Sequence, residues 1–377
     1  MSSQVPMKER ALSPDRIARI GREMQAACPG FDAASFTAQV TADLPRLELK
    51  ARIARTAEGL RQHLPVTGQA ALDTLLRSLP ATPEAAGAET DFGLYIYAPH
   101  SAYVAAHHLH PEHLDQAFAA LATITPYFSA EDAVRVFLTT YPERTLEAAA
   151  TWAAASDHRV RRLASESLRP HLPWSTGTGL PVDTALPLLD ALYADNSRFV
   201  TTSVANHLRD IARTRPDLVL ATLTRWRTEG RATDTELAFI TREALKARLR
   251  AGWPPAYTIL GYDPRADVSV SPLRLARTDY RLGDDVTFEA DLTAPTDTPV
   301  HVMYVLTHTN PDTRTGEKVA HLTRATIKAG APLHLAKTHP LKSTGTAALA
   351  PGSYHLALQV NGRRLPPALL RITNRPA

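Results

Sequence analysis

The sequence has few of the features that mark secreted or membrane proteins. Its 377 residues include one cysteine, Cys28, so no disulfide can form within the chain. No apolar run reaches the ~18 residues of a membrane-spanning helix. The opening stretch "MSSQVPMKERALSPD" has no apolar segment after its charges, as a secretory signal would. These absences predict a cytoplasmic protein that does not bind membranes.

Common catalytic and cofactor motifs are also missing. There is no phosphate-binding loop, no dinucleotide fingerprint and no nucleophile elbow. The stretch "HHLHPEH" gathers His107, His108, His110 and His113 at spacings that raise the question of a metal site. Because a proline interrupts this run and no cysteine lies nearby, we expect no metal and no other cofactor.

Lysine is scarce, and the positive charge is unevenly spread. Only seven of the 42 basic residues are lysine, and arginine is the better bidentate partner for phosphate, although a GC-rich genome would give the same excess. Residues 1–150 hold 13 basic and 17 acidic residues, residues 151–250 hold 15 and 11, and residues 264–377 hold 14 and 9. The positive charge therefore lies in the middle and at the end of the chain.

Two periodicities divide the chain. The first ~260 residues repeat apolar positions three and four apart, as helices do, whereas the last ~110 alternate in short segments between turn residues. We place the boundary within "GYDPRAD", residues 261–267. The sequence predicts an all-α domain at 1–263 and an antiparallel β-sandwich at 264–377.

The helical part contains an internal repeat. Val160, Val200 and Ile240 are 40 residues apart, and we expect each to begin a helix. A period of ~40 residues with two helices per repeat is typical of HEAT or armadillo stacks, whose second helices line a concave face.

Each of these helices has a polar side that should face the groove of such a stack. The apolar side of the first helix is formed by Val160, Leu163, Ala164, Ser167 and Leu168. The opposite side carries Arg162, Glu166 and Arg169, and the next repeat places Thr202, Asn206 and Arg209 there, with Asp210 and Arg213 beside them. From spacing alone, Arg162 and Glu166 form an ordinary surface pair worth ~0.3–0.5 kcal/mol. By the same standard, Trp152 and Trp174 are core or capping residues.

Longer motifs carry a family resemblance. The stretches "RVRRLASESLRPHLPW" and "FVTTSVANHLRDIARTRPD" resemble "HVRRLASEGxRPRLPW" and "VRRSVANHLNDIAKDHPD" of the AlkC branch of the HEAT-like-repeat alkylpurine DNA glycosylases. "SAEDAVRVFLTTYPERTL" is similar to the preceding repeat of that family, usually "TAEFAIRPFL", and "LELKARIARTAEGLRQHLP" is similar to its N-terminal helices. "GSYHLALQVNGRRL" resembles the last hairpin of the immunoglobulin-like domain that some members carry. The resemblance spans nearly the whole chain and implies an all-α HEAT-like-repeat solenoid followed by an all-β immunoglobulin-like sandwich.

The resemblance also implies a function. Members hydrolyse the N-glycosidic bond of cationic alkylated bases, such as 3-methyladenine and 3-methylcytosine, in base excision repair and without base flipping. The implied partner is double-stranded DNA containing alkylated bases, bound by a monomer associated with the nucleoid. The alternatives from other classes are a non-catalytic HEAT-repeat sensor that binds alkylated DNA and a scaffold for a protein partner.

The site residues follow from matching the motifs. Glu131 and Glu166 match the two groove glutamates, with Asp210 as a third catalytic carboxylate. Trp174 matches the groove tryptophan, and Trp152 is a second candidate for contact with the lesion or its sugar. A carboxylate beside the sugar would act as general base and counter-charge, and an aromatic ring beside a cation adds ~0.5–2 kcal/mol. The expected phosphate-binding residues are Arg135, Arg161, Arg162, Arg169, Arg209 and Arg213.

The chain departs from the family motifs at several positions, among them Arg209, which replaces an Asn. Asp132 and Val136 replace Phe and Pro, Thr201 and Thr202 replace two arginines, and Glu243 stands where His is frequent. Losing two arginines should weaken DNA binding, and Asp132 places a like charge beside Glu131. A scaffold has no need for glutamates between arginines, and a sensor would keep arginines rather than glutamates, so the pattern favours the enzyme.

Overall fold

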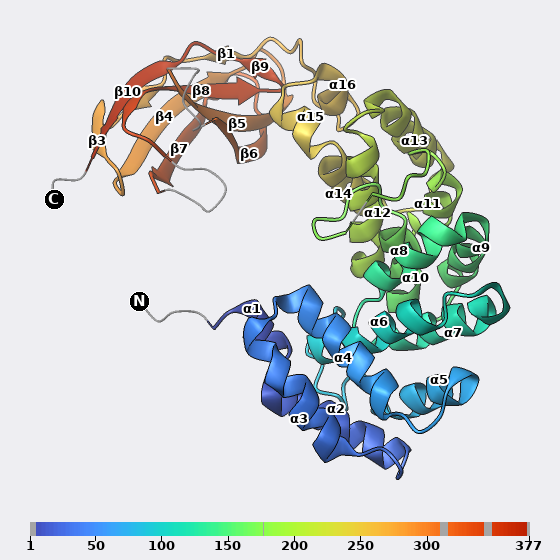
Figure 1. Ribbon diagram of the computed structural model, residues 1–377. Coiled ribbons are helices and arrows are strands. Elements are labelled where there is room, and N and C mark those ends of the chain that lie inside the picture. The colour runs from blue at the N-terminus through green and yellow to red at the C-terminus, as the bar shows by residue number, and fades with distance from the viewer. Residues whose placement is uncertain (1–4, 176, 310–315, 343–348, 375–377) are drawn as a thin grey trace. The chain divides into compact units, whose positions relative to one another are not determined.

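Helices form the first part of the chain and strands the last (Figure 1). The computed structural model describes residues 5–175, 177–309, 316–342 and 349–374. The last described helix ends at Thr258 and the first strand begins at Ser269, which confirms the predicted change from helix to strand. The helices are α1 (Met7–Ala11), α2 (Pro14–Ala27), α3 (Ala33–Asp43), α4 (Leu49–His63), α5 (Gly68–Arg77), α6 (Ala98–His107), α7 (Leu114–Ile124), α8 (Glu131–Thr140), α9 (Pro142–Ala153), α10 (His158–Ser167), α11 (Leu186–Leu192), α12 (Arg198–Ile211), α13 (Pro216–Glu229), α14 (Asp234–Ala244), α15 (Lys246–Arg250) and α16 (Pro254–Thr258).

Helix α10, which carries several of the predicted site residues, packs against four neighbouring helices. It contacts α8, α9, α11 and α12. Its N-terminus is capped by Asp157, whose carboxylate accepts a hydrogen bond from the backbone N–H of Arg159 at 2.7 Å. Val160, Leu163 and Ala164 are buried on its apolar side, as the periodicity predicts. The cap fixes where α10 begins, and the apolar side of the helix is covered by its neighbours.

The third predicted repeat helix has a different start. Val160 and Val200 lie in the first turns of α10 and α12, but Ile240 is well inside α14, which begins at Asp234. The prediction of a helix beginning at Ile240 is wrong because a capping signal lies earlier. The hydroxyl of Thr233 accepts a hydrogen bond from the backbone N–H of Glu236 at 3.2 Å, the pairing found at a capping box.

Cα packing divides the chain into two compact units. One comprises residues 1–214 and 229–240, and the other comprises 215–228 and 241–377. Helical residues after 241 thus pack in the same unit as the strands. The functional division at residue 263 stays a prediction.

The strands form two facing sheets. Their bounds are β1 (Ser269–Val270), β2 (Arg274–Leu275), β3 (Asp279–Arg281), β4 (Asp285–Thr293), β5 (Thr298–His308), β6 (Glu317–Ile327), β7 (Leu333–Pro340), β8 (Gly352–Val360), β9 (Arg363–Arg364) and β10 (Ala368–Thr373). One sheet has the order β1-β4-β2 with β7 also paired to β4, and the other has the order β3-β10-β8-β5-β6 with β9 paired to β8. The pairs are antiparallel except β3–β10. Phe288 of β4 and Tyr304 of β5 meet in the core, with ring centroids 5.2 Å apart, so the inner faces of the two sheets pack together.

None of the helices in the described ranges combines the length and apolar character that a membrane crossing needs.

Candidate active site

A buried arginine of α10 lies between two buried glutamates. Arg162 Nη2 lies 3.3 Å from Oε1 of Glu166, one turn further along α10, and its Nη1 lies 3.7 Å from Oε2 of Glu131, the first residue of α8. Arg162 Nη1 also donates a hydrogen bond to Ser129 Oγ at 2.5 Å, and this hydroxyl donates to Glu131. The side chains of Arg162, Glu131 and Glu166 are only 7%, 9% and 6% exposed. The Arg162–Glu166 pair expected on the surface is therefore desolvated, and Arg162 also links α10 to α8 through Glu131.

Two phenylalanine rings lie beside the guanidinium of this arginine. The central carbon of the Arg162 guanidinium lies 5.2 Å from the ring centroid of Phe92 and 4.7 Å from that of Phe199 on α12. The two rings also meet edge to face, with centroids 4.9 Å apart. Such cation–π contacts contribute ~0.5–2 kcal/mol each, with the larger values where water is excluded. The rings therefore help to fix Arg162 between its two carboxylates.

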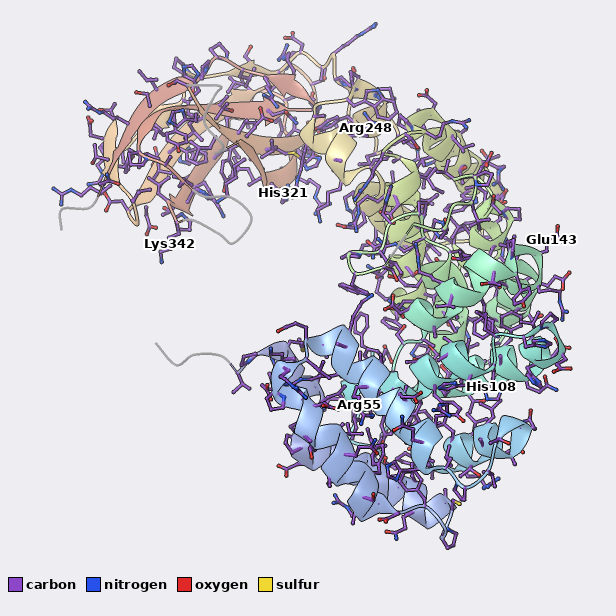
Figure 2. The ribbon with its side chains drawn as sticks, viewed as in Figure 1. Arg55, His108, Glu143, Arg248, His321 and Lys342 are labelled. Atoms are coloured by element: carbon purple, nitrogen blue, oxygen red, sulfur yellow. The ribbon has the colours of Figure 1, made fainter. Side chains whose placement is uncertain are left out.

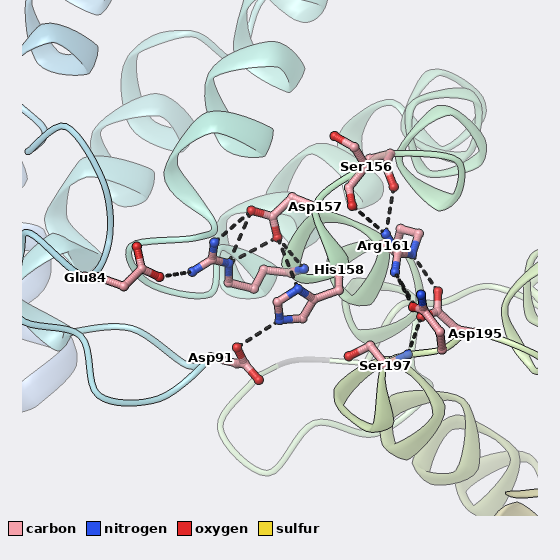
Figure 3. A network of polar contacts seen from close by, with 11 residues as sticks. Glu84, Asp91, Ser156, Asp157, His158, Arg161, Asp195 and Ser197 are labelled. Atoms are coloured by element: carbon pink, nitrogen blue, oxygen red, sulfur yellow. Dashed lines mark hydrogen bonds and ion pairs between the residues drawn. The ribbon is translucent and has the colours of Figure 1, made fainter.

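The loop that carries Phe92 is anchored at both of its neighbours. Gly93 has a φ of 72°, and a Cβ there would lie 1.9 Å from the carbonyl oxygen of Tyr127, so only glycine fits. On the other side, Asp91 Oδ1 lies 2.8 Å from Nε2 of His158 at the start of α10 (Figure 3). Although Phe92 is 55% exposed, its position beside α10 is thus fixed by its neighbours.

A second arginine extends the network from α10 to α12. Arg169 Nη1 donates to Glu166 Oε1 at 2.7 Å, and its Nε donates to Asp210 Oδ2 at 2.9 Å. Ser203 Oγ donates to the other oxygen of Glu166 at 2.6 Å. The three carboxylates chosen from the sequence are thus joined through two arginines, which helical spacing alone could not establish.

The charges of this network keep Glu166 ionised. Burial alone would raise the pKa of the Glu166 carboxyl, but Arg162 and Arg169 outweigh it and hold this pKa below its usual range. Burial would lower the pKa of Arg169, yet Glu166 and Asp210 raise it. By contrast, burial lowers the pKa of the neighbouring His207 to about 4, so this imidazole is neutral at pH 7.

The other predicted phosphate ligands occupy varied positions. Arg135 is buried, and its Nη1 donates to the carbonyl oxygens of Ser167 at 3.3 Å and Arg169 at 2.9 Å, satisfying acceptors at the end of α10. Burial is the main cause that lowers the pKa of Arg135. Arg209 is half-buried, whereas the Arg213 side chain is 59% exposed.

Arg161 is held by a network at the start of α10 (Figure 3). Its Nε and Nη2 donate to the two oxygens of Asp195 at 2.5 and 3.0 Å, and its Nη1 donates to the carbonyls of Ala155 and Ser156 at 2.9 and 2.8 Å. A role for Arg161 or Arg135 in phosphate binding stays a prediction, but each has a clear structural role.

Trp174 is the more accessible of the two candidate tryptophans. It is 59% exposed, and the ammonium of Lys50 on α4 donates to its carbonyl oxygen. Lys50 also pairs with Asp132 at 2.9 Å, and the hydroxyl of Ser175 donates to Asp132. Asp132, which stands where the family motif has Phe, thus helps to hold the segment that carries Trp174.

Trp152 lies in the core. Its side chain on α9 is 5% exposed and meets Phe118 of α7 nearly edge to face, with centroids 6.0 Å apart. This position favours a packing role, so we retain only Trp174 as a candidate for contact with the lesion.

The departures on α12 have local partners. The hydroxyl of Thr201 donates to Glu236, which also pairs with Arg198 at 2.5 Å. Thr202 is half-buried, and its hydroxyl donates to the carbonyl of Arg198 at 2.6 Å. Glu243, another departure, pairs with Lys246 at 3.2 Å.

Several residues of the network were missed from the sequence. Ser129 and Phe199 lie within or beside the motifs that resemble the family, so their places next to Glu131 and Val200 were a usable signal. Ser203 lies on α12 one turn after Phe199, within the same motif, and offered the same signal. No signal in the sequence pointed to Phe92, because it lies outside these motifs and far from α10 in the chain.

The four clustered histidines lie around the end of α6 and before α7; His108 is buried, and Figure 2 labels it. In the part of the chain that the structure describes, no group of three or more histidine, cysteine, aspartate or glutamate side chains could hold a metal ion.

Comparisons with known proteins cover both parts of the chain. Residues 102–247 match a family described as DNA alkylation repair enzyme, and residues 269–374 match the C-terminal Ig-like domain of the uncharacterised protein YhaZ. The uncharacterised YhaZ of Bacillus subtilis (strain 168) is 28% identical over 325 residues, covering 85% of this chain and 86% of that protein.

A solved structure is similar over almost the full length. It is the Pseudomonas fluorescens alkylpurine DNA glycosylase AlkC bound to DNA containing an abasic site analog. The identity is 30%, the TM-score is 0.85, and the match covers 96% of this chain and 98% of that one. The chain therefore belongs to the AlkC/YhaZ-type family of DNA alkylation repair proteins and has an immunoglobulin-like C-terminal domain.

Proposed function

We propose that this chain is a DNA glycosylase that hydrolyses the N-glycosidic bond of cationic alkylated bases in double-stranded DNA. The observation that carries the proposal is the pair of buried carboxylates, Glu131 and Glu166, held on the two sides of Arg162. The similarity to AlkC supports it, since that enzyme was solved with DNA containing an abasic site analog and base removal leaves an abasic site.

Little acid catalysis is needed for this chemistry. Alkylation of a ring nitrogen gives the base a positive charge, so the base leaves with the bonding electron pair as a neutral molecule. The enzyme must stabilise the positive sugar and direct a water oxygen to C1′. The proton that this water loses passes to a carboxylate. Unmodified bases leave poorly and are retained. This chemistry suits 3-methyladenine and 3-methylcytosine and requires no flipping of the base.

We assign different roles to the two glutamates. Glu166 accepts hydrogen bonds from Arg169 and Ser203 and forms an ion pair with Arg162, so most of the lone-pair positions on its carboxylate are used. Glu131 receives one hydrogen bond, from Ser129, and its nearest arginine nitrogen is 3.7 Å away. Glu131 is therefore the better general base, while Glu166 sets the position of Arg162 and adds negative charge beside the sugar.

We infer the remaining contacts from exposure and charge. Trp174 would lie against the lesion or its sugar. Arg213 is the arginine of the predicted set best placed for a phosphate, since its side chain is 59% exposed, and the half-buried Arg209 lies four residues before it. In this proposal residues 1–263 form a HEAT-like-repeat glycosylase domain that acts as a monomer, with residues 264–377 as the immunoglobulin-like domain.

The test is direct measurement of released bases. The purified protein is incubated with DNA treated with a methylating agent, and free bases are identified by mass spectrometry. Release of 3-methyladenine by the parent protein, with loss of release in Glu131→Gln, is the expected result. Release that is equal in both proteins would remove Glu131 from the mechanism.

A non-catalytic DNA sensor is the second candidate. It is favoured by the pairing of Glu131, Glu166 and Asp210 with arginines, since a buried ion-pair network can serve structure alone. Tight binding to alkylated DNA without any base release would support the sensor over the enzyme.

A further inference from the structure

The helical unit contains a pocket beside the candidate active site. Its volume is about 350 Å³, near the lower end of the ~300–1,000 Å³ of small-molecule sites. It lies between α4, α6 and α8, and alanines make up much of its wall. Its lining includes Lys50, Ser101, Ala102, Ser129, Asp132 and Val136.

The polar groups of the wall are already engaged. The hydroxyl of Ser101 donates to the carbonyl of Ala98 at 3.0 Å, and that of Ser129 donates to Glu131. Lys50 and Asp132 pair with each other at 2.9 Å. A nucleobase in this pocket would bury polar edges without good partners, which is unfavourable. The wall is suited instead to a hydrocarbon or aryl group.

Both sides of the pocket connect to candidate site residues. Ser129, which lines it, hydrogen-bonds to Glu131 and Arg162. Lys50, which also lines it, donates to the carbonyl of Trp174. A group in the pocket would therefore lie one side chain away from the carboxylate that we place beside the sugar.

Two departures from the family motif line this pocket. Asp132 stands where the motif has Phe and Val136 where it has Pro. The Asp132 carboxylate is held by Lys50 and by the hydroxyl of Ser175. Aspartate occupies less volume than a phenylalanine ring, so this chain leaves apolar space that the usual motif residue would reduce.

We propose that the pocket accepts a bulky apolar substituent, such as an arylmethyl group, on N3 of an alkylated adenine. The proposal rests on the proposed glycosylase function. Purine N3 lies on the minor-groove edge of a base pair, on the same side as the glycosidic bond. A protein that brings Glu131 to C1′ from this groove therefore meets the N3 substituent directly. The bond that breaks and the water that adds are the same as for a methylated base.

The experiment measures binding separately from chemistry. Duplexes carry one 3-deaza-3-methyladenine or one 3-deaza-3-benzyladenine, whose glycosidic bonds are stable because the base is uncharged. Burying a phenyl group should make the protein bind the benzyl duplex ~10–100-fold more tightly than the methyl duplex. Equal or weaker binding of the benzyl duplex by the parent protein would overturn the proposal.

Two variants fill the pocket from opposite walls. Ala102→Leu acts from α6 and Val136→Phe from α8, and each should reduce the preference for the benzyl duplex at least tenfold. The matched control is Ala119→Leu, at an exposed position of α7 outside the pocket, which should leave the preference unchanged. If the folded pocket variants keep the full benzyl preference, the substituent binds elsewhere and the proposal fails.

A parallel excision assay separates this inference from the proposed function. Release of 3-methyladenine without a benzyl preference would support the glycosylase and overturn the pocket assignment. A benzyl preference that the pocket variants abolish, without release of any base, would support the pocket and overturn the glycosylase.

Discussion

Replacing Arg162 with methionine removes the charge that two buried glutamates share while keeping a long apolar side chain. Breaking a buried ion pair by removing one partner typically costs ~3–5 kcal/mol, because the remaining charge stays desolvated. The side chains of Glu131 and Glu166 are 9% and 6% exposed, so water cannot readily replace the arginine. Loss of the cation beside Phe92 and Phe199 adds to the cost. We expect Arg162→Met to lower the free energy of unfolding of the helical unit by ~3–5 kcal/mol.

Urea unfolding at pH 7, with hydrogen–deuterium exchange of α10, measures this loss where it occurs. The control is Arg144→Met on α9. Its side chain is 46% exposed and pairs with Asp115 at 2.6 Å and Glu147 at 3.1 Å. Exposed pairs contribute ~0–1 kcal/mol, so the control should change stability little.

A double variant tests the cause of the loss. In Arg162→Met the ionised Glu166 loses one of its two arginines, so changing Glu166 to glutamine should recover part of the stability. The single and double variants together give the coupling energy, for which we expect at least ~1 kcal/mol. A loss in Arg162→Met no larger than in Arg144→Met would refute the view that the bridge holds the site together.

The remaining predictions concern chemistry, DNA contact, pH and the second part of the chain. Glu131→Gln and Glu166→Gln should each slow base release by ~10²–10³, a magnitude usual for a lost electrostatic contact, with DNA affinity retained; single-turnover kinetics and binding titrations measure both. Arg213→Ala should reduce the slope of log K against log salt by ~0.9, whereas Arg161→Ala should change it less because carboxylate and carbonyl oxygens already hold its guanidinium. The pKa of Glu166 is lowered from 4.5 by folding, so its ionised form stabilises the protein above pH 4.5 and this contribution is lost as pH falls through the folded pKa; urea titrations should show the parent and Glu166→Gln converging in acid. Removal of residues 264–377 should give a protein that aggregates and shows less protection of 241–263 in hydrogen exchange.

Helix α10 was largely predictable from local sequence. The apolar spacing of Val160, Leu163 and Ala164 and the cap at Asp157 act within a few residues of one another, so the sequence specifies α10 directly. The start of α14 follows the same rule. The signal there is Thr233 before Asp234 and Glu236, and the repeat spacing led to a later start because it ignored this cap.

The burial of the polar side of α10 could not be predicted in this way. Helical periodicity shows that Arg162, Glu166 and Arg169 share a side, but it does not show what covers that side. The cover comes from Phe92 in a distant loop and from Phe199 on α12, positions that only the tertiary fold brings together. The family motifs supplied the choice of Glu131 and Glu166, and the structure supplied the arginine that joins them.

The packing at the end of the helical part explains why the boundary in sequence pattern is no boundary in packing. Gln359 of β8 donates to the carbonyl of Leu249 at 2.9 Å and to the hydroxyl of Tyr257 at 2.8 Å, and Tyr257 itself is fully buried. Gly252 and Gly362 approach so closely that a Cβ on Gly252 would lie 2.5 Å from the carbonyl oxygen of Gly362. A cut near residue 263 would therefore expose the buried ring of Tyr257 and remove the Gln359 amide, which donates to the hydroxyl of this tyrosine and to the carbonyl of Leu249. Loss of DNA binding in such a truncation would report this damage as well as any contact that the sandwich makes with DNA, so charge substitutions on exposed strand residues are the sounder test of such a contact.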